Sequence, residues 1–129
     1  EDRSEMLSWL MFLATGLAPF SGQSVHFRHA APEQVPYAIN RYLFEAKRHY
    51  EVLEIHLEGR EYIVGDEYSI ADISAWGWID KATVVLGEDG LASTRPAVEK
   101  ARNIAKDIAF KSDFDDEAAR ALYPQNFTE

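Results

Sequence analysis

The stretch that decides the fold is YIVGDEYSIADI, residues 62–73, because it specifies the start of a helix twice. Ser69 is placed as an N-cap whose hydroxyl accepts from the backbone N–H of Asp72, while the Asp72 carboxylate reaches back to the N–H of Ser69. Tyr68 and Ile73 flank this capping box with the spacing of a hydrophobic staple. The pattern therefore predicts a helix that begins at Ser69.

The segment after this start is almost entirely apolar. Only three of the residues at positions 70 to 86 are charged, and Gly87 follows as a helix terminator. A helix that is apolar on most faces lies in the middle of a bundle. We therefore expect a central buried helix from about Ser69 to Leu86, with Trp76 and Trp78 in the core.

The N-terminal third of the chain has its own helical pattern. Residues 5–18 are apolar on almost every face, which predicts a helix that is buried on two sides. Gly16 and Pro19 would kink or interrupt this helix, so we expect a bend near Pro19. Residues 20–29 are then expected to lie at an exposed end.

Further helices are predicted on both sides of the central one. Residues 32–58 place apolar side chains at steps of three and four, with charges on the opposite side and Gly59 as the terminator. Pro96 suits the first turn of another helix, and a last short helix is expected over residues 113–122. Strand patterns are not convincing anywhere, so the sequence predicts an all-α bundle of four to six helices.

Composition excludes several classes of function. The chain has 129 residues, 13 Lys plus Arg, 22 Asp plus Glu and a net charge of −9, so nucleic acid and anionic membrane surfaces are poor partners. Without cysteine it has no disulfide, zinc–cysteine site or thiol nucleophile. No apolar run approaches the roughly 20 residues that cross a bilayer. We expect one cytoplasmic domain, and a first residue other than Met favours a piece of a longer polypeptide.

Metal chemistry is disfavoured by the spacing of the possible ligands. A di-iron bundle needs two Glu-x-x-His pairs, whereas Glu45 and His49 are four apart and no second pair exists. His26 and His29 could share a helical face, but no third ligand is near them in sequence. His56 has apolar neighbours and is expected at the edge of the core. Neither a P-loop nor a Gly-x-Ser-x-Gly motif occurs.

Three stretches resemble a known family. Residues 62–73 resemble the signature of the C-terminal helical domain of cytosolic glutathione transferases, in which a Ser-x-x-Asp box begins the central helix. The RPAV sequence at 95–98 resembles the start of that family's next helix, although Ala101 replaces a frequent tryptophan. The stretch from Gly16 to Tyr42, with GLAPFSGQ, HF, AP and PYAINRY in order, resembles the bacterial nu-class and fungal nitrogen-regulator-like branch.

The resemblance implies what residues 1–129 would do. They would be a single all-helical C-terminal domain, with the N-terminal thioredoxin-like domain absent from this chain and the first helix at the interdomain and homodimer interfaces. The implied activity is glutathione-dependent conjugation of a small electrophile or reduction of a disulfide. Glutathione is the implied co-substrate, no metal is expected, and the residue that activates its thiol lies outside this chain.

Candidate substrate-binding residues lie where the kinked first helix and the start of the second would open toward the missing domain. They are Phe20, Gln23, His26, Phe27, Tyr37 and Arg41. Arg41 could bind a carboxylate through two parallel hydrogen bonds, or form a surface ion pair with Glu45 one turn away. For the aromatic residues the alternative is ordinary core packing.

Two other functions remain open at this point. The same helical domain is reused without catalysis, so a non-catalytic protein-interaction module is the alternative to an enzyme. A free-standing metal-binding bundle is a weaker third hypothesis.

Overall fold

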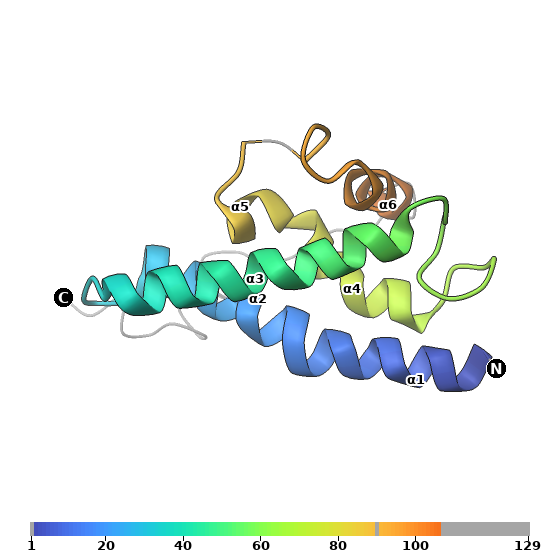
Figure 1. The fold of residues 1–129 in the computed structure, drawn as a ribbon, viewed down its shortest axis with the longest axis horizontal. Coiled ribbons are helices and arrows are strands. Elements are labelled where there is room, and N and C mark those ends of the chain that lie inside the picture. The colour runs from blue at the N-terminus through green and yellow to red at the C-terminus, as the bar shows by residue number, and fades with distance from the viewer. Residues whose placement is uncertain (1, 90, 107–129) are drawn as a thin grey trace, which may run out of the picture.

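Helices are the only regular elements in the part of the chain that the structure, a computed structural model, describes, which is residues 2–89 and 91–106 (Figure 1). The predicted all-α fold is therefore confirmed, while the helix expected over residues 113–122 lies outside the described residues. The elements are α1 (Asp2–Phe12), the π-helical η1 (Leu13–Leu17), α2 (Ala18–Val25), the π-helical η2 (His26–Ala30), α3 (Pro36–Leu57), α4 (Ile70–Asp80), α5 (Ala82–Leu86) and α6 (Pro96–Lys106).

The long helix α3 is the strut on which the other helices pack. In Figure 1 it crosses the molecule, with α1 and α2 along one flank and α5 and α6 along the other. Its core face is apolar at the predicted spacing, through Ala46, Tyr50, Leu53 and Leu57. The same face also buries Glu45, His49 and Glu54, so the expectation that charges lie only on the opposite side is wrong.

The ends of α3 follow from local backbone chemistry. Pro36 occupies the first turn, where its missing N–H costs no hydrogen bond, so the helix begins there and not at Pro32. Beyond the last helical residue, Gly59 has φ +71°, the left-handed conformation that ends many helices. The predicted terminator is confirmed.

The first helix continues through Pro19 to Ala30, and the interruption expected there is replaced by a wide turn. In η1 the N–H of Ala18 bonds to the carbonyl of Leu13, five residues back. A proline in a regular helix clashes with the carbonyl four residues before it, and the wider π-helical turn relieves this crowding. Residues 20–29 are not an exposed end, because Ser21 and Ser24 are fully buried against α3 and α5.

The capping box begins α4 as the sequence predicts. Asp72 Oδ2 accepts from the backbone N–H of Ser69 at 2.9 Å, and Ser69 Oγ accepts from the N–H of Ala71 at 3.2 Å. The other carboxylate oxygen, Asp72 Oδ1, accepts from the N–H of Ile63 at 2.9 Å and so ties the preceding loop to the helix. The rings of Tyr68 and Tyr62 lie 6.0 Å apart, edge to face.

The hydrophobic staple stays a prediction. Tyr68 has its aromatic neighbour in the loop, and Ile73 is 60% exposed in the described structure. A staple contact would have to form on the outside of the domain.

Removing the Asp72 carboxylate is expected to destabilise the domain by about 1–2 kcal/mol, the upper part of the range for a lost cap. Asp72→Ala should cost more than Ser69→Ala, because it also leaves the N–H of Ile63 without its partner. Denaturant unfolding measures the difference. Asp66→Ala, at an exposed aspartate of the same loop, is the control and should change stability by less than about 0.5 kcal/mol. Equal losses for the two aspartates would contradict the capping box.

The central helix is broken at Lys81, which corrects the prediction of one continuous helix to Leu86. The Tyr50 hydroxyl donates to the carbonyl of Trp78 at 2.7 Å, and the N–H of Lys81 bonds to the same oxygen. In a continuous helix this oxygen would accept from the N–H of Ala82. Tyr50 therefore takes the place of that bond, and α5 begins as a separate helix that ends at Gly87 with φ +65°.

Both tryptophans of α4 are half-buried, and Trp78 packs against the core. The most deeply buried residues of this helix are Ala71 and Ala75, followed by Ile79 near its end. Small side chains let α4 approach its neighbours closely, which keeps the bulky indoles at the edge of the core. α4 packs against α1, α2, α5 and α6, but Ile70, Ile73 and Gly77 are exposed, so the prediction of a fully central helix is wrong on this face. The tryptophans are also less deeply placed than predicted.

Candidate functional site

Three of the predicted site residues meet around a tyrosine that is not among the sequence candidates. The rings of Phe27 and Tyr42 stack with centroids 5.2 Å apart and an interplanar angle of 15°. Phe20 lies 6.4 Å from Tyr42, and the His26 ring meets Phe27 edge-on at 5.2 Å. We call Phe20, Phe27 and Tyr42 the aromatic wall. It is built by α2, η2 and the first turns of α3.

The other candidates lie outside this wall. Gln23 is exposed, and Tyr37 is 79% exposed at the start of α3. Neither side chain is packed among the rings. Their proposed contact with a substrate stays a prediction.

Arg41 forms the ion pair with Glu45 that was the alternative to a binding role. Its Nη1 lies 2.5 Å from Glu45 Oε1, while Arg48 donates from Nε and Nη2 to Glu45 Oε2 at 2.9 and 2.8 Å. The Glu45 side chain is only 8% exposed, whereas that of Arg41 is 50% exposed. Two guanidinium groups on one carboxylate leave one positive charge in excess at the surface.

Hydrogen bonding from Arg48, together with that from Arg41, holds the pKa of the Glu45 carboxyl below its ordinary value. The stability that this carboxylate contributes is therefore present above its unfolded-state pKa and is lost as the pH falls through the folded-state pKa. At neutral pH the ionised carboxylate of Glu45 therefore keeps its ion pairs with Arg41 and Arg48.

His49 connects the aromatic wall to α1. Its ring lies 5.0 Å from that of Phe20 and 5.3 Å from that of Phe12. Nδ1 lies 2.7 Å from the carbonyl of Glu45 and must carry a proton, because a carbonyl only accepts. The other side of the imidazole lies against Gly16, where a Cβ atom would be 2.4 Å from Nε2. His49 is a packing residue that needs a glycine beside it.

His56 is placed at the edge of the core, as its apolar neighbours predict. Its ring lies 4.0 Å from that of Trp9, and Nε2 donates to the carbonyl of Ile63 at 2.7 Å. The bond joins α3 to the loop before α4. Like His49, His56 is held by packing and a hydrogen bond to the backbone, which is typical of a structural residue.

Within residues 2–89 and 91–106, no set of three or more histidine, aspartate or glutamate side chains could hold a metal ion. His26 and His29 belong to η2, and only His26 has a ring contact with Phe27. In the same part of the chain, every helix is too short or too polar to cross a membrane.

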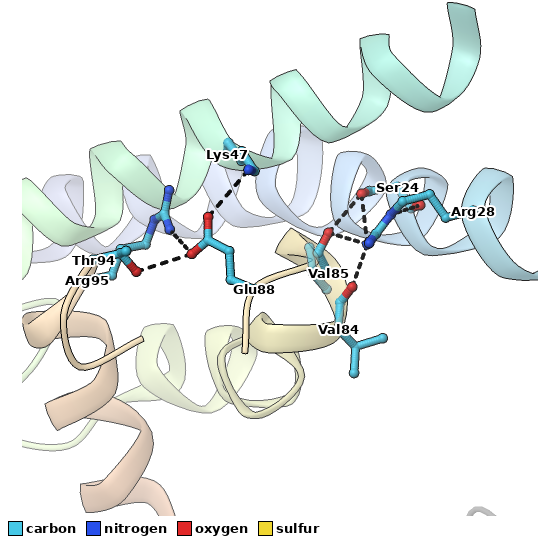
Figure 2. A network of polar contacts seen from close by, with 8 residues as sticks. All are labelled: Ser24, Arg28, Lys47, Val84, Val85, Glu88, Thr94 and Arg95. Atoms are coloured by element: carbon cyan, nitrogen blue, oxygen red, sulfur yellow. Dashed lines mark hydrogen bonds and ion pairs between the residues drawn. The ribbon is translucent and has the colours of Figure 1, made fainter. Parts of the chain in front are cut away.

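Two carboxylates, the buried Glu54 and the partly buried Glu88, join α3 to α6 and to the loop before it. Glu54 accepts from the N–H groups of Ala97 and Val98 at 2.8 Å each, so its carboxylate caps the N-terminus of α6. Glu88 accepts from Arg95 Nη1 at 2.6 Å and lies 3.5 Å from Lys47 Nζ (Figure 2). No local pattern points to the contacts with α3, because Glu54 and Lys47 lie more than forty residues from their partners.

Comparison with known proteins agrees with this architecture. Residues 19–103 match the family described as Glutathione S-transferase, C-terminal domain. Disulfide-bond oxidoreductase YfcG of Escherichia coli is 46% identical over 82 residues, which cover 64% of this chain and 38% of the relative. The glutathione transferase URE2P6 from Phanerochaete chrysosporium, in complex with oxidized glutathione, has a TM-score of 0.75 at 34% identity, covering 83% of this chain and 49% of that one.

A third relative is a regulator. The nitrogen regulation fragment of the yeast prion protein Ure2p has a TM-score of 0.70 at 31% identity, covering 81% of this chain and 49% of that chain. The chain thus spans about half the length of these solved structures and 38% of YfcG. It belongs to the glutathione S-transferase C-terminal domain family, in the branch that contains YfcG and Ure2p.

Proposed function

We propose that this domain is part of a glutathione-dependent enzyme that reduces disulfides, and that the aromatic wall forms one side of the site for the disulfide. The observation that carries the proposal is the meeting of Phe20, Phe27 and Tyr42 at the junction of α2, η2 and α3. Apolar and aromatic surfaces with a few polar groups are typical of small-molecule sites. The proposal is further supported by YfcG, a disulfide-bond oxidoreductase, and by the oxidized glutathione bound to URE2P6.

The reaction would use two glutathione molecules. The thiolate of the first attacks one sulfur of the substrate disulfide, forms a mixed disulfide and releases one substrate thiolate. The second glutathione thiolate attacks the glutathione sulfur of the mixed disulfide, which releases the other substrate thiolate and forms oxidised glutathione. The two glutathione protons end on the two product thiols. In this reaction both attacking thiols belong to glutathione, and residues 1–129, which contain no cysteine, supply neither of them.

The residues of this domain would bind and orient, while the residue that activates the thiol would lie elsewhere in the protein. Packing against the aromatic wall would remove water from the apolar part of the disulfide. Arg41 offers the unpaired positive charge of its cluster to a carboxylate of glutathione. In a chain with net charge −9, such a local cation favours an anionic co-substrate.

We also propose that α1 and α4 contact a thioredoxin-like domain and a second subunit. Leu7 and Met11 on α1, and Ile70 and Ile73 on α4, are exposed large apolar side chains. The beginning of α4 lies beside α1, because Ser69 Oγ is 3.8 Å from Met6 Sδ. Exposed apolar groups that gather on adjacent helices mark interaction sites. We place the protein in the cytoplasm, where glutathione is kept reduced.

The test uses the full-length protein with reduced glutathione and hydroxyethyl disulfide, and follows the thiol released. Phe27→Leu and Tyr42→Leu keep an apolar side chain but remove a stacked ring. Each is expected to lower kcat/KM by about tenfold, which corresponds to roughly 1.4 kcal/mol of transition-state binding. Tyr62→Leu is the matched control, because its ring pair with Tyr68 lies beside the capping box.

Three outcomes would each reject one part of the proposal, namely the enzyme, the aromatic wall as substrate site, or the second subunit. One is a full-length protein that neither binds glutathione by calorimetry nor releases thiol, and the non-catalytic interaction module would then stand. Another is an equal loss for the Tyr62 control, which would remove the aromatic wall from the substrate site. Sedimentation of the same sample tests the second subunit, and a strictly monomeric profile rejects it.

A further inference from the structure

Arg28 joins η2, which carries Phe27 of the aromatic wall, to the end of α5. It lies in η2, next to Phe27, and its Nη2 donates to the carbonyls of Val84 and Val85, the latter at 2.6 Å (Figure 2). Its Nε donates to the carbonyl of Ser24 at 3.1 Å, within its own helix. One guanidinium thus spans two elements that are more than fifty residues apart in sequence.

The end of α5 needs such a partner. The last carbonyls of a helix have no N–H of their own to accept from, and they form the negative end of the helix dipole. The Ser24 hydroxyl donates to Val85 O at 2.8 Å, and Arg28 adds donors to Val84 O and Val85 O together with a positive charge. Burial lowers the pKa of the Arg28 guanidinium, which fits a group held away from water.

Gly87 makes room for this guanidinium. It ends α5 with φ +65°, and a Cβ atom at this position would lie 2.7 Å from Arg28 Nη1. The same φ region is adopted by Gly65, at φ +63°, where a Cβ atom would meet nothing within 4 Å. The two glycines share this backbone conformation, but only Gly87 has an arginine where a Cβ atom would lie.

From these contacts we infer that Arg28 is a positioning residue, which holds η2 so that Phe27 stacks on Tyr42. η2 is a π-helical turn of five residues with no buried side chain, so packing alone holds it weakly. Its backbone continues from α2, with the N–H of His26 bonded to Gly22 O and Gln23 O, but all the described side-chain hydrogen bonds of η2 are made by Arg28. The consequence for substrate binding rests on the proposed function, whereas the placement of η2 does not.

The test compares four variants of the full-length protein by hydrogen exchange and by kinetics. Arg28→Met keeps the length of the side chain and removes all its donors, while Arg28→Lys restores one cation. Gly87→Ala places a Cβ atom against the guanidinium of Arg28. Gly65→Ala is the control for the strain of an alanine in the left-handed conformation. Exchange is measured in residues 26–31 and, as an internal reference, in the middle of α3.

We expect Arg28→Met and Gly87→Ala to speed exchange in residues 26–31 by roughly tenfold or more, with the middle of α3 unchanged, because a local opening becomes easier. Arg28→Lys should restore part of the protection, and Gly65→Ala should leave this segment as it is. In the disulfide assay, Arg28→Met should raise KM for the disulfide about fivefold with little change in kcat, as expected for lost binding.

The two proposals fail separately. Unchanged exchange in residues 26–31, or an equal increase in the middle of α3, would overturn the positioning role. An equal effect of Gly65→Ala would overturn the part assigned to Gly87. Local loosening in a protein that has no thiol-transfer activity would support the placement of η2 and reject only the proposed enzyme.

Discussion

Replacing Glu54 by alanine is expected to lower the free energy of unfolding by about 3 kcal/mol. The carboxylate is buried in α3 and accepts from the N–H groups of Ala97 and Val98 at 2.8 Å each. Without it, two donors at the N-terminus of α6 lose charge-assisted bonds in a place that water reaches poorly. The loss should be among the largest for any single side chain in this domain, because α6 packs on both α3 and α4.

Denaturant unfolding of three variants measures this effect. Glu54→Gln keeps one acceptor oxygen and the size of the side chain, so it should lose about half as much stability as Glu54→Ala. Glu51→Ala, at an exposed glutamate one turn earlier in α3, is the control and should change stability by less than about 0.5 kcal/mol. A Glu54→Ala loss as small as that of the control would show that α6 does not depend on this cap.

Gly16→Ala is expected to destabilise the domain by about 2 kcal/mol, although alanine usually stabilises a helix. The added Cβ would lie 2.4 Å from Nε2 of His49. This imidazole has little room to move, because it is buried, its Nδ1 is bonded to the carbonyl of Glu45, and the rings of Phe12 and Phe20 lie close to it. The methyl group must therefore displace a buried and hydrogen-bonded side chain.

The control is another glycine of a helix. Gly77 is exposed in α4, and a Cβ atom there would meet nothing within 4 Å, so Gly77→Ala should stabilise the protein by about 0.5–1 kcal/mol. A double-mutant cycle with His49→Ala isolates the clash, since Gly16→Ala should cost much less once the imidazole is gone. Losses that simply add in the cycle would exclude His49 as the cause.

The architecture could be predicted because its signals are local. Ser69 and Asp72 are three residues apart, and the core face of α3 repeats at steps of three and four, so neither depends on a distant part of the chain. The breaks could not be predicted in the same way. The division between α4 and α5 depends on the Tyr50 hydroxyl, which comes from another helix and reaches Trp78 across 28 positions of sequence.

The candidate site, like the fold, could be predicted only where the signal is local in sequence. The resemblance pointed to Phe20, His26 and Phe27, which meet, and also to Gln23 and Tyr37, which are exposed instead. Tyr42 was not identified, because its stacking on Phe27 exists only once the first helix lies along α3. Arg28 was missed for a similar reason, since its acceptors at Val84 and Val85 are 56 and 57 residues away.

The wide turn η1 decides which side chains of α2 can belong to the aromatic wall. A π-helical turn holds one more residue than the α-helical turn it replaces, so each residue after it is rotated by about 100° relative to a regular helix. That rotation decides which side chains of residues 18–25 face α3, including the buried Ser21 and the Phe20 ring near Tyr42. Deleting one residue before Pro19 would therefore turn other side chains of residues 18–25 toward α3 and move the Phe20 ring away from Tyr42, without altering any residue of the wall itself.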